Sequence, residues 1–305
     1  MTVSVVIPTK NRGEMLLAAV RSALAADEVD EVVLVDAGSE DGSLKRAAAL
    51  GDVRVVEGPF SNAAATRNAG LQAATGEHIA FLDSDDLMHR RKITCLAPLL
   101  RADARVALAH GTTRVIDASG AVNERATVIQ NRAIGDAAQF GTTYAALARR
   151  CVMFTSATLM RRAAIEAVGG YDETLDAYED WDLYLRLSLE WQLLYAVCPA
   201  ADYRVWPGNV AWRRTAEWTI RVADRHLAGL MEIPATERRA AKYGLLRRIA
   251  MSSAILVERG AARRAALAAF RTEPATAMRD GDVLRPLAGS FLPKRVLNAR
   301  RGSVQ

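Results

Sequence analysis

The 305-residue sequence has few cysteines and no long apolar run, and these shortages exclude several classes of protein. Its three cysteines, Cys95, Cys151 and Cys198, are far apart and form no CxxC pair, so we expect neither a disulfide framework nor a thiolate metal site. No apolar stretch approaches the roughly 20 residues that span a bilayer. The first residues contain no basic segment followed by a long apolar one, and they predict no secretory signal. Together these features predict a cytoplasmic protein.

Two common nucleotide-binding motifs are also missing. No GxGxxG follows the first apolar run, which disfavours a dinucleotide-binding fold, and no GxxxxGK[ST] occurs, which argues against a P-loop enzyme. What the sequence does contain is typical of a globular protein with a sizeable core, since half of its residues are hydrophobic and a quarter are charged.

Positive charge is concentrated at one end of the chain. The formal net charge is +5, but residues 211–305 contain 19 Arg and Lys against 8 Asp and Glu, so that part carries +11 and the first 210 residues carry −6. One interpretation is that arginines cover the outer faces of amphipathic helices. A second hypothesis is peripheral contact of these helices with anionic lipid at the inner face of a membrane. Nucleic acid is not an expected partner, because the basic part lacks interleaved aromatic residues.

The first hundred residues alternate short apolar runs with helical stretches. We expect strands at 3–8, 31–36, 53–57 and 78–83, and helices at 13–26, 43–50 and 62–74. This alternation predicts a mostly parallel sheet with helices on both faces. Ligands of such sheets lie beyond the carboxyl ends of the strands, so the polar residues that end these runs should converge at one edge.

The middle of the chain mixes both kinds of element, and the end is helical. We expect strands at 106–110, 114–117, 121–129 and 153–160, and helices at 162–168 and 180–189. Helical spacing then continues over 212–231, 237–259 and 261–271. We therefore predict an α/β domain at 1–210, with halves at 1–103 and 104–210, followed by a helical region at 211–305.

Three carboxylates, Asp83, Asp85 and Asp86, follow the apolar run that ends at Leu82. Like charges this close together are unfavourable unless a cation or hydrogen-bond donors offset them. Mg²⁺ and Mn²⁺ prefer oxygen ligands and commonly bridge carboxylates to substrate phosphates, so the cluster predicts a divalent metal site. The alternative is that an aspartate caps a helix over 87–100, but one aspartate would serve for that.

In four motifs between residues 3 and about 210, the sequence resembles the inverting GT-A glycosyltransferases of family 2. The motifs are VVIPTKNR (5–12), VDAGSEDGS (35–43), ATRNAG (65–70) followed by GEHIAFLDSDD (76–86), and GGYDE (169–173) followed by YEDWDL (178–183). The resemblance implies an α/β fold of the GT-A type, a mixed and mostly parallel sheet flanked by helices, with a helical C-terminal segment. It also implies that residues 1–103 are the nucleotide-binding half of the catalytic domain and that residues 104–210 are its acceptor-binding half.

The resemblance also implies an activity. This is the transfer of a sugar from a nucleotide-diphosphate sugar to a hydroxyl acceptor, which is a glycan, a lipid-linked molecule or a small molecule. One carboxylate must take the acceptor proton in an in-line displacement, and the resemblance implies that it is Asp180. Its neighbours Glu179 and Asp182 should raise its proton affinity. A bound Mn²⁺ or Mg²⁺ would stabilise the charge on the departing diphosphate.

The site residues that follow from the motifs form three groups. The implied donor-nucleotide-binding residues are Pro8, Thr9, Lys10, Asn11, Asp36, Asn62, Arg67 and Asp85. The implied metal ligands are Asp83, Asp85 and Asp86. The candidates on the acceptor side are Glu179, Trp181 and Trp206.

Two positions depart from the family pattern. Asp36 is followed by Ala37 where a second aspartate is usual, which leaves UDP, TDP and GDP open as the donor nucleotide. Trp206 follows Tyr203-Arg204-Val205 at a position where relatives often have histidine. An indole N–H is a donor only and cannot bind a cation, so Trp206 either stacks on an acceptor sugar or packs in the core.

The sequence is compatible with two rival functions. Nucleotidyl transfer uses a related sheet and a metal, but it usually requires a glycine-rich basic loop after the first strand. The loop PTKNRG (8–13) contains basic residues but little glycine. A degenerate relative that only binds glycan or a partner is disfavoured, because both acidic motifs are retained.

Overall fold

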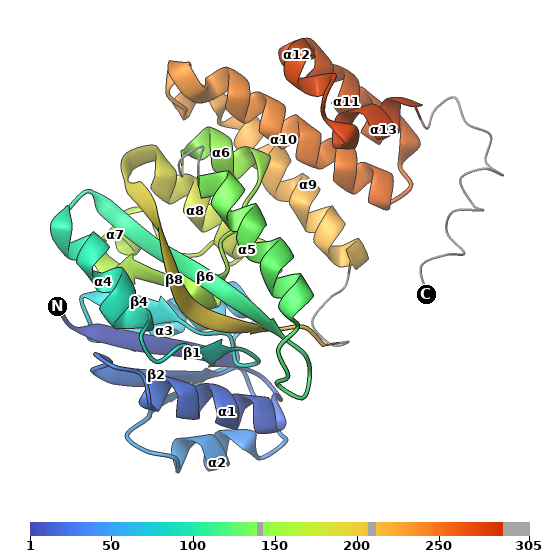
Figure 1. The fold of residues 1–305 in the computed structure, drawn as a ribbon. Coiled ribbons are helices and arrows are strands. Elements are labelled where there is room, and N and C mark those ends of the chain that lie inside the picture. The colour runs from blue at the N-terminus through green and yellow to red at the C-terminus, as the bar shows by residue number, and fades with distance from the viewer. Residues whose placement is uncertain (139–142, 207–211, 289–305) are drawn as a thin grey trace. The chain divides into compact units, whose positions relative to one another are not determined.

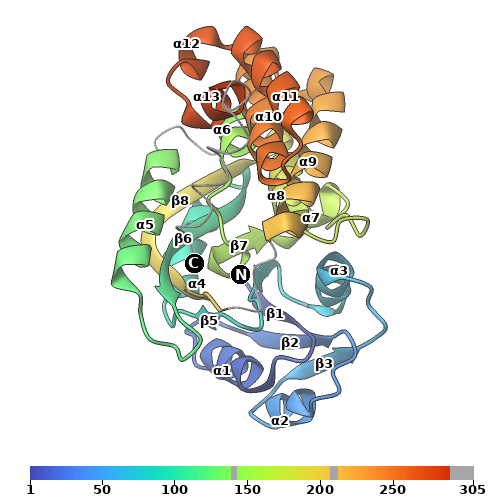
Figure 2. The same cartoon turned by 90° about the vertical axis from the view of Figure 1, so that its right-hand side faces the viewer.

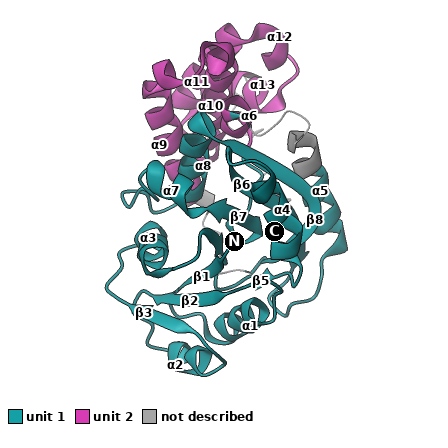
Figure 3. Cartoon of the chain, turned by 90° about the vertical axis from the view of Figure 1, so that its left-hand side faces the viewer, with its two compact units in different colours: residues 1–143, 151–210 teal, residues 144–150, 211–305 magenta. Residues whose placement is uncertain are grey.

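The structure is a computed structural model and describes residues 1–138, 143–206 and 212–288. The chain divides into two compact units, which are coloured separately in Figure 3. The first unit consists of residues 1–143 and 151–210, and the second of residues 144–150 and 211–305. The predicted boundary between residues 210 and 211 lies outside the described residues.

An eight-stranded mixed sheet forms the centre of the first unit (Figures 1 and 2). Its strands, in spatial order, are β3 (Arg54–Glu57), β2 (Glu31–Asp36), β1 (Val3–Thr9), β4 (His78–Phe81), β7 (Thr158–Arg161), β6 (Val106–Ile116), β8 (Gln192–Arg204) and β5 (Leu87–Met88). Strands β3, β2, β1 and β4 are parallel, as are β6 and β8. Strand β7 is antiparallel to both of its neighbours, and β5 is antiparallel to β8. The predicted mixed sheet is confirmed.

Helices cover both faces of this sheet, because alternate residues of its strands are apolar in both directions. Val5 and Ile7 of β1 belong to a core that includes α1 (Gly13–Leu24), α2 (Ser43–Ala48) and α4 (Lys92–Ala102). Val6 points the other way, toward α3 (Ala63–Ala73), which lies opposite α1 in Figure 2. The remaining helices of the unit are α5 (Glu124–Ala138), the 3₁₀ turn η1 (Thr155–Ala157), α7 (Arg162–Ala167) and α8 (Glu179–Glu190).

The register of the parallel strands brings several chain segments to one edge of the sheet. Thr9 at the end of β1 pairs with Asp36 at the end of β2, and Val6 pairs with Phe81 at the end of β4. The loops at 10–12 and 37–42 and the acidic turn at 83–86 follow directly. The expected convergence of these segments is therefore present.

Three segments of the middle differ from the sequence-based expectations. Residues 106–116 form the single strand β6 in place of two strands, and residues 153–160 form η1 followed by β7 in place of one strand. The strand expected at 121–129 is wrong, because α5 begins at Glu124. Asn123 marks the start of α5, because its side chain accepts a hydrogen bond from the Ala126 N–H, as an N-cap residue does. The apolar pattern of the following residues obscured this signal in the sequence.

Strand β8 was not predicted. It contains Pro199, which cannot donate to a strand ladder, and its pairing with β6 shifts register at three points. These shifts break the regular alternation of apolar and polar residues on which strand prediction depends. The helix expected at 87–100 begins later, at Lys92, and the two-residue strand β5 comes before it. The acidic turn therefore does not cap a helix.

One disulfide bond contradicts the expectation from the cysteine spacing. Cys95 of α4 and Cys198 of β8 are bonded, with their Cα atoms 6.5 Å apart, although 103 residues separate them in the sequence. The prediction failed because it used distance along the chain, whereas α4 packs against β8 in the fold. The cytoplasmic assignment rested partly on unpaired cysteines, so it loses that support.

The second unit is helical throughout its described residues. Its elements are α6 (Tyr144–Arg149), α9 (Trp212–Ala228), η2 (Leu230–Glu232), α10 (Ala235–Ile255), α11 (Arg259–Thr272), α12 (Pro274–Ala277) and α13 (Gly281–Ala288). The expected helices at the C-terminal end are therefore present. In the described part of the chain, no helix is both long and apolar enough to cross a membrane.

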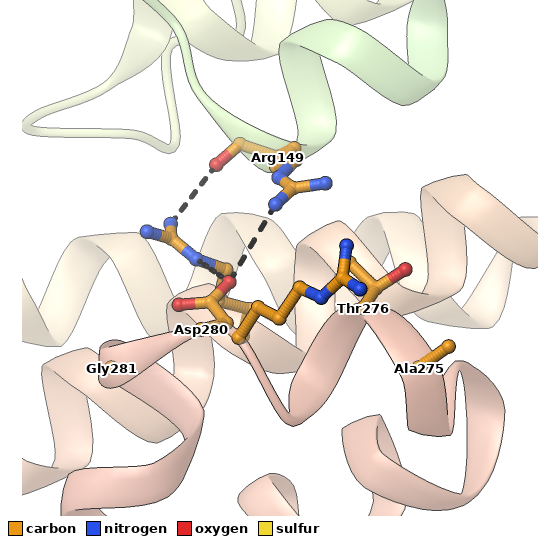
Figure 4. A pocket seen from close by; sticks show the side chains of 7 residues that line it. Arg149, Ala275, Thr276, Asp280 and Gly281 are labelled. Atoms are coloured by element: carbon orange, nitrogen blue, oxygen red, sulfur yellow. Dashed lines mark hydrogen bonds and ion pairs between the residues drawn. The ribbon is translucent and has the colours of Figure 1, made fainter.

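A polar pocket of about 480 Å³ lies within the second unit (Figure 4). Its lining residues are Arg149, Arg247, Ala275, Thr276, Arg279, Asp280 and Gly281. Asp280 accepts hydrogen bonds from the Tyr243 hydroxyl at 2.8 Å and from Arg247 Nε at 2.7 Å. Burial raises the pKa of Asp280, but the bond from Tyr243 and the charge of Arg247 outweigh it, so the pKa lies below its usual value. This network ties α10 to the turn before α13.

Gly70 in α3 gives the first testable prediction. A Cβ atom at this position would lie 2.9 Å from Val35 Cγ2 and still closer to Val6 Cγ1, so Gly70→Ala must push α3 away from β1 and β2. We expect a loss of about 1–3 kcal/mol in the free energy of unfolding, measured by urea denaturation. Gln72→Ala, at an exposed position of the same helix, is the control and should change the stability by less than about 0.5 kcal/mol. Equal effects of the two substitutions would contradict the packing described.

Candidate active site

The three carboxylates of the acidic turn have different surroundings, and Asp86 is the most buried, with 2% of its surface exposed. Its Oδ2 accepts a hydrogen bond from the Ser156 hydroxyl at 2.6 Å, and its Oδ1 accepts one from the Arg204 backbone N–H at 2.8 Å. Burial raises the pKa of Asp86 well above its usual value, and the charges of Asp83 and Asp85 raise it further. Each Asp86 oxygen thus accepts one hydrogen bond from the protein, and the expected role of Asp86 as a metal ligand stays a prediction.

Asp83 and Asp85 are only partly buried. Asp83 Oδ1 accepts a hydrogen bond from Arg67 Nη2 at 2.7 Å, and Asp85 Oδ2 accepts one from Trp206 Nε1 at 2.9 Å. The second oxygen of each carboxylate accepts no hydrogen bond from the described residues. Each of these two carboxylates therefore has an oxygen that can contact a ligand.

Asp180 is the second residue of α8, which begins after Tyr178 in a left-handed conformation. Its Oδ2 accepts a hydrogen bond from the Thr155 hydroxyl at 3.1 Å, and its Oδ1 accepts one from the Trp181 N–H at 2.7 Å. Burial raises the pKa of Asp180 to about 6, and the charge of Glu179 adds to the effect. Asp182, which we also expected to contribute, is instead paired with Arg186 within α8.

Arg67 of α3 joins the two acidic motifs. Its Nη2 forms an ion pair with Asp83 at 2.7 Å, and its Nη1 pairs with Glu179, the residue next to Asp180. The guanidinium is buried, and it also lies over the ring of Tyr171. Since one planar group contacts both carboxylates, the motifs at 83–86 and 179–182 lie side by side. Arg67 is thus engaged by the protein, and its expected role in binding the nucleotide stays a prediction.

Two residues of η1 that the motifs did not indicate contact both acidic segments. Thr155 donates to Asp180, while the next residue, Ser156, donates to Asp86 and accepts a hydrogen bond from the Asp83 N–H at 3.0 Å. The signal was a concentration of hydroxyl residues at 155–158, which had been interpreted as part of a strand.

Lys92 is a second feature that the sequence did not indicate. Its side chain is fully buried, and its Nζ donates to the Ser156 carbonyl oxygen at 2.9 Å. Burial lowers the pKa of Lys92 to about 7, although the charges of Asp83 and Asp86 oppose the change. A lysine at the start of an amphipathic helix normally lies at the surface, so its pattern in the sequence gave no warning.

Thr9 is the expected donor-binding residue whose side chain is best placed to bind a ligand. It is 4% exposed, and its Oγ1 has no hydrogen-bond partner among the described residues. Buried hydroxyl groups are normally hydrogen-bonded, so an unpartnered one at the ligand edge of the sheet suits a bound polar molecule. Its register partner Asp36 is different, because its carboxylate accepts hydrogen bonds from Ser39 and from the Gly38 N–H. Asp36 therefore stabilises its own turn, and the structure does not favour the expected base contact.

The other expected donor-binding residues also differ in their exposure and in their hydrogen bonds within the protein. Pro8 is partly buried, and Lys10 and Asn11 are exposed at the loop after β1. Asn62 is engaged in the structure, since its Oδ1 caps α3 at the Ala65 N–H and its amide nitrogen donates to the Glu173 carbonyl oxygen. The side chain that was expected to bind nucleotide is instead a helix cap.

The three acceptor-side candidates have different surroundings in the structure. Trp181 is 0% exposed, which is incompatible with contact to an acceptor, so this expectation is wrong. Glu179 is buried against Arg67. Trp206 donates a hydrogen bond to Asp85 of the acidic turn, and its stacking on an acceptor sugar stays a prediction.

The residues present fit a hard divalent cation, although they do not enclose one. In residues 1–138, 143–206 and 212–288, no group of three or more His, Cys, Asp and Glu side chains could hold a metal ion. Mg²⁺, however, is usually bound by one or two carboxylates together with substrate phosphates and water. Asp83 and Asp85, each with one oxygen not hydrogen-bonded by the described residues, match that incomplete donor set.

Comparison with known proteins identifies the family. The sequence profile described as glycosyl transferase family 2 matches residues 4–169, which is more than half of the chain. The chain belongs to glycosyltransferase family 2. This agrees with the resemblance noted in the sequence, and it favours glycosyl transfer over the nucleotidyl transfer and binding-only alternatives.

Several family members resemble the chain over part of their length. The succinoglycan biosynthesis protein ExoU of Rhizobium meliloti is 33% identical over 215 residues, which cover 60% of this chain and 56% of that protein. The pre-mycofactocin glycosyltransferase of Mycobacterium tuberculosis is 34% identical over 191 residues, covering 61% of this chain and 38% of that protein. The chain thus spans about half, or less, of the length of the curated relatives that it matches.

Solved structures of similar fold support the GT-A assignment. Staphylococcus aureus TarS 1-349 in complex with UDP-GlcNAc aligns with a TM-score of 0.64 at 17% identity, covering 91% of this chain and 83% of that one. The mannosyltransferase PcManGT of Pyrobaculum calidifontis, in complex with GDP-Man and Mn²⁺, aligns with a TM-score of 0.59 at 19% identity, covering 94% and 79%. At these identities the likeness shows the fold.

Replacing Arg67 tests the link between the motifs. Arg67→Met leaves the buried Glu179 without its cation, so we expect the free energy of unfolding to fall by about 3–5 kcal/mol in urea denaturation at pH 8. The control is Arg90→Met, which removes an exposed pair with Asp27 in the same unit and should cost less than about 1 kcal/mol. Similar losses for the two variants would mean that the Arg67 bridge is not a strong constraint.

Proposed function

We propose that the chain is an inverting, metal-dependent glycosyltransferase that transfers a sugar from a nucleotide-diphosphate sugar to a hydroxyl acceptor. The observation that carries the proposal is the bridge made by Arg67, which brings the acidic turn and the Asp180 motif to a common site. Family 2 membership supports glycosyl transfer as the activity. The carboxylate of Asp180, whose pKa is raised to about 6, suits a general base that works near neutral pH.

The reaction is a single in-line displacement. The acceptor hydroxyl oxygen forms a bond to the anomeric carbon of the sugar while the bond from that carbon to the diphosphate oxygen breaks, so the configuration inverts. Asp180 takes the hydroxyl proton, and the electron pair of the broken bond leaves with the nucleoside diphosphate. The hydrogen bond from Thr155 and that from the Trp181 N–H orient the Asp180 carboxylate for this step.

Asp83 and Asp85 are the residues that would hold a divalent cation, Mn²⁺ or Mg²⁺. When bound, such an ion neutralises negative charge that develops on the departing diphosphate. The complex of PcManGT with GDP-Man and Mn²⁺ supports a metal-assisted reaction on this fold. Asp86 takes a supporting role, because its hydrogen bonds to Ser156 and to the Arg204 N–H fix the turn that presents the other two carboxylates.

Thr9 is our choice for a direct contact with the donor, with Pro8, Lys10 and Asn11 around it. The complexes of the structural neighbours with UDP-GlcNAc and with GDP-Man support a nucleotide-sugar donor. UDP, TDP and GDP all remain candidates for the nucleotide. The acceptor is a hydroxyl group of a glycan, a lipid-linked molecule or a small molecule, and contact of the basic C-terminal helices with a membrane stays a prediction.

Asp180→Asn tests the base. Asparagine cannot accept the acceptor proton, so we expect the transfer rate to fall by about 100-fold or more, while calorimetry still detects metal-dependent donor binding. A buried carboxylate with a raised pKa opposes folding when it is charged, so the variant should be no less heat-stable than the unaltered protein at pH 8. Asp176→Asn, at an exposed position before the same helix, should keep a near-normal rate. Near-normal turnover by Asp180→Asn would refute the proposed mechanism.

The raised pKa of Asp180 also predicts a pH profile. The base acts in its deprotonated form, so kcat/KM should be level above pH 7 and should fall about tenfold per pH unit below pH 6. Donor affinity is measured over the same range, so that loss of binding can be separated from loss of the base. A profile that stays level down to pH 4.5 would contradict the assignment.

A further inference from the structure

The loop after β1 presents an arginine from a fixed backbone position. Asn11 donates its backbone N–H to Ser39 Oγ at 2.8 Å, and Gly13 donates its backbone N–H to Asp41 Oδ2 at 2.9 Å. The side-chain oxygen of Asn11 accepts a further hydrogen bond from the Glu40 N–H. Arg12 lies between these two residues, so hydrogen bonds of its neighbours fix its backbone position without contacts of its own side chain.

The guanidinium of Arg12 lies over the ring of Trp206, with its Cζ atom 5.5 Å from the ring centroid. Among the described residues it has no carboxylate or carbonyl partner. Other arginines of this unit that lie near the site, such as Arg67 and Arg186, are each paired with a carboxylate. A half-buried arginine without an anion, at the ligand edge of the sheet, is suited to an anionic ligand because a guanidinium binds phosphate through two parallel hydrogen bonds.

Trp206 connects this arginine to the acidic turn. The edge of its indole donates to Asp85 Oδ2 at 2.9 Å, while the same ring system lies under Arg12. The chain around it is fixed at 204 and 205, because the Arg204 N–H donates to Asp86 and the Val205 N–H donates to the Ile116 carbonyl oxygen. One side chain therefore sets the position of a cation and of a carboxylate together.

We propose that Arg12 binds a phosphate group of the donor diphosphate, and that Trp206 is the positioning residue that holds Arg12 and Asp85 on the same diphosphate. This inference rests on the proposed function. A divalent cation on Asp85 and the guanidinium of Arg12 would both contact the phosphate oxygens and share their negative charge. The Trp206 N–H cannot bind the cation, but it orients the carboxylate that would hold it.

The test compares two ligands on the full chain in the presence of Mn²⁺. The first is whichever of UDP, GDP and TDP the unaltered protein binds most tightly by calorimetry. The second is the matching nucleoside, whose weaker binding is monitored by ligand-observed NMR.

Arg12→Met removes the charge and keeps the length of the side chain. We expect it to weaken diphosphate binding by about tenfold or more and to leave nucleoside binding unchanged. Arg105→Met, at an exposed position of the same unit, is the charge-matched control and should change neither.

Trp206→Phe tests the positioning role, because it keeps a ring under Arg12 and removes the N–H that holds Asp85. We expect the Mn²⁺ concentration needed for half-maximal diphosphate binding to rise severalfold, with nucleoside binding unchanged. A purely structural role would instead lower the melting temperature and weaken both ligands equally.

The outcomes separate this inference from the one on which it rests. Diphosphate binding by Arg12→Met at the level of the unaltered protein, or an equal loss of nucleoside and diphosphate, would overturn the role of Arg12. An unchanged Mn²⁺ requirement in Trp206→Phe would overturn the role of Trp206. If the unaltered protein binds none of the three diphosphates in the presence of Mn²⁺, the proposed function itself fails and the inference fails with it.

Discussion

The ion pairs of Arg67 are the interaction on which the rest of the site depends. A buried guanidinium contacts Asp83 of the acidic turn and Glu179 beside Asp180, so it offsets charge on both sides at once. Without it, the first unit would hold several carboxylates close together in a poorly solvated region, which is strongly unfavourable. Helix α3 carries this arginine, and Gly70 of the same helix allows it to pack closely on β1 and β2. The packing of one helix thereby sets the electrostatics of the site.

The site contains several groups whose charge the fold disfavours. Burial raises the pKa of Asp180 and of Asp86 and lowers that of Lys92, so each of these groups opposes folding in its charged form. Such arrangements concentrate at functional sites, because a base or a ligand-binding turn needs a proton affinity that solvent alone would not give it. The buried Lys92 supports the same region, because its Nζ donates a hydrogen bond to the carbonyl oxygen of Ser156, whose hydroxyl contacts Asp86.

The sequence predicted much of the first half of the fold, because strands there are short apolar runs bounded by turn residues. It predicted less of the middle, where β8 contains Pro199 and register shifts, and where Asn123 starts a helix inside an apparent strand. Among the candidate site residues, the motifs singled out the acidic turn and Asp180, two segments that Arg67 joins in the structure. They could not show that Asp36 and Asn62 are occupied by hydrogen bonds within the protein, or that Trp181 is buried. Those properties depend on which neighbours the fold brings to each side chain.

The adjacency of Thr155 and Ser156 has a consequence for how this site can vary. Thr155 contacts the proposed base, and Ser156 contacts the turn that carries the proposed cation ligands. Consecutive residues have a nearly constant Cα separation, about 3.8 Å, so covalent geometry limits how far apart these two parts of the site can move. A change of donor or acceptor preference would then have to come from substitutions in the surrounding loops, while the distance between the proposed base and the proposed cation ligands stays nearly the same.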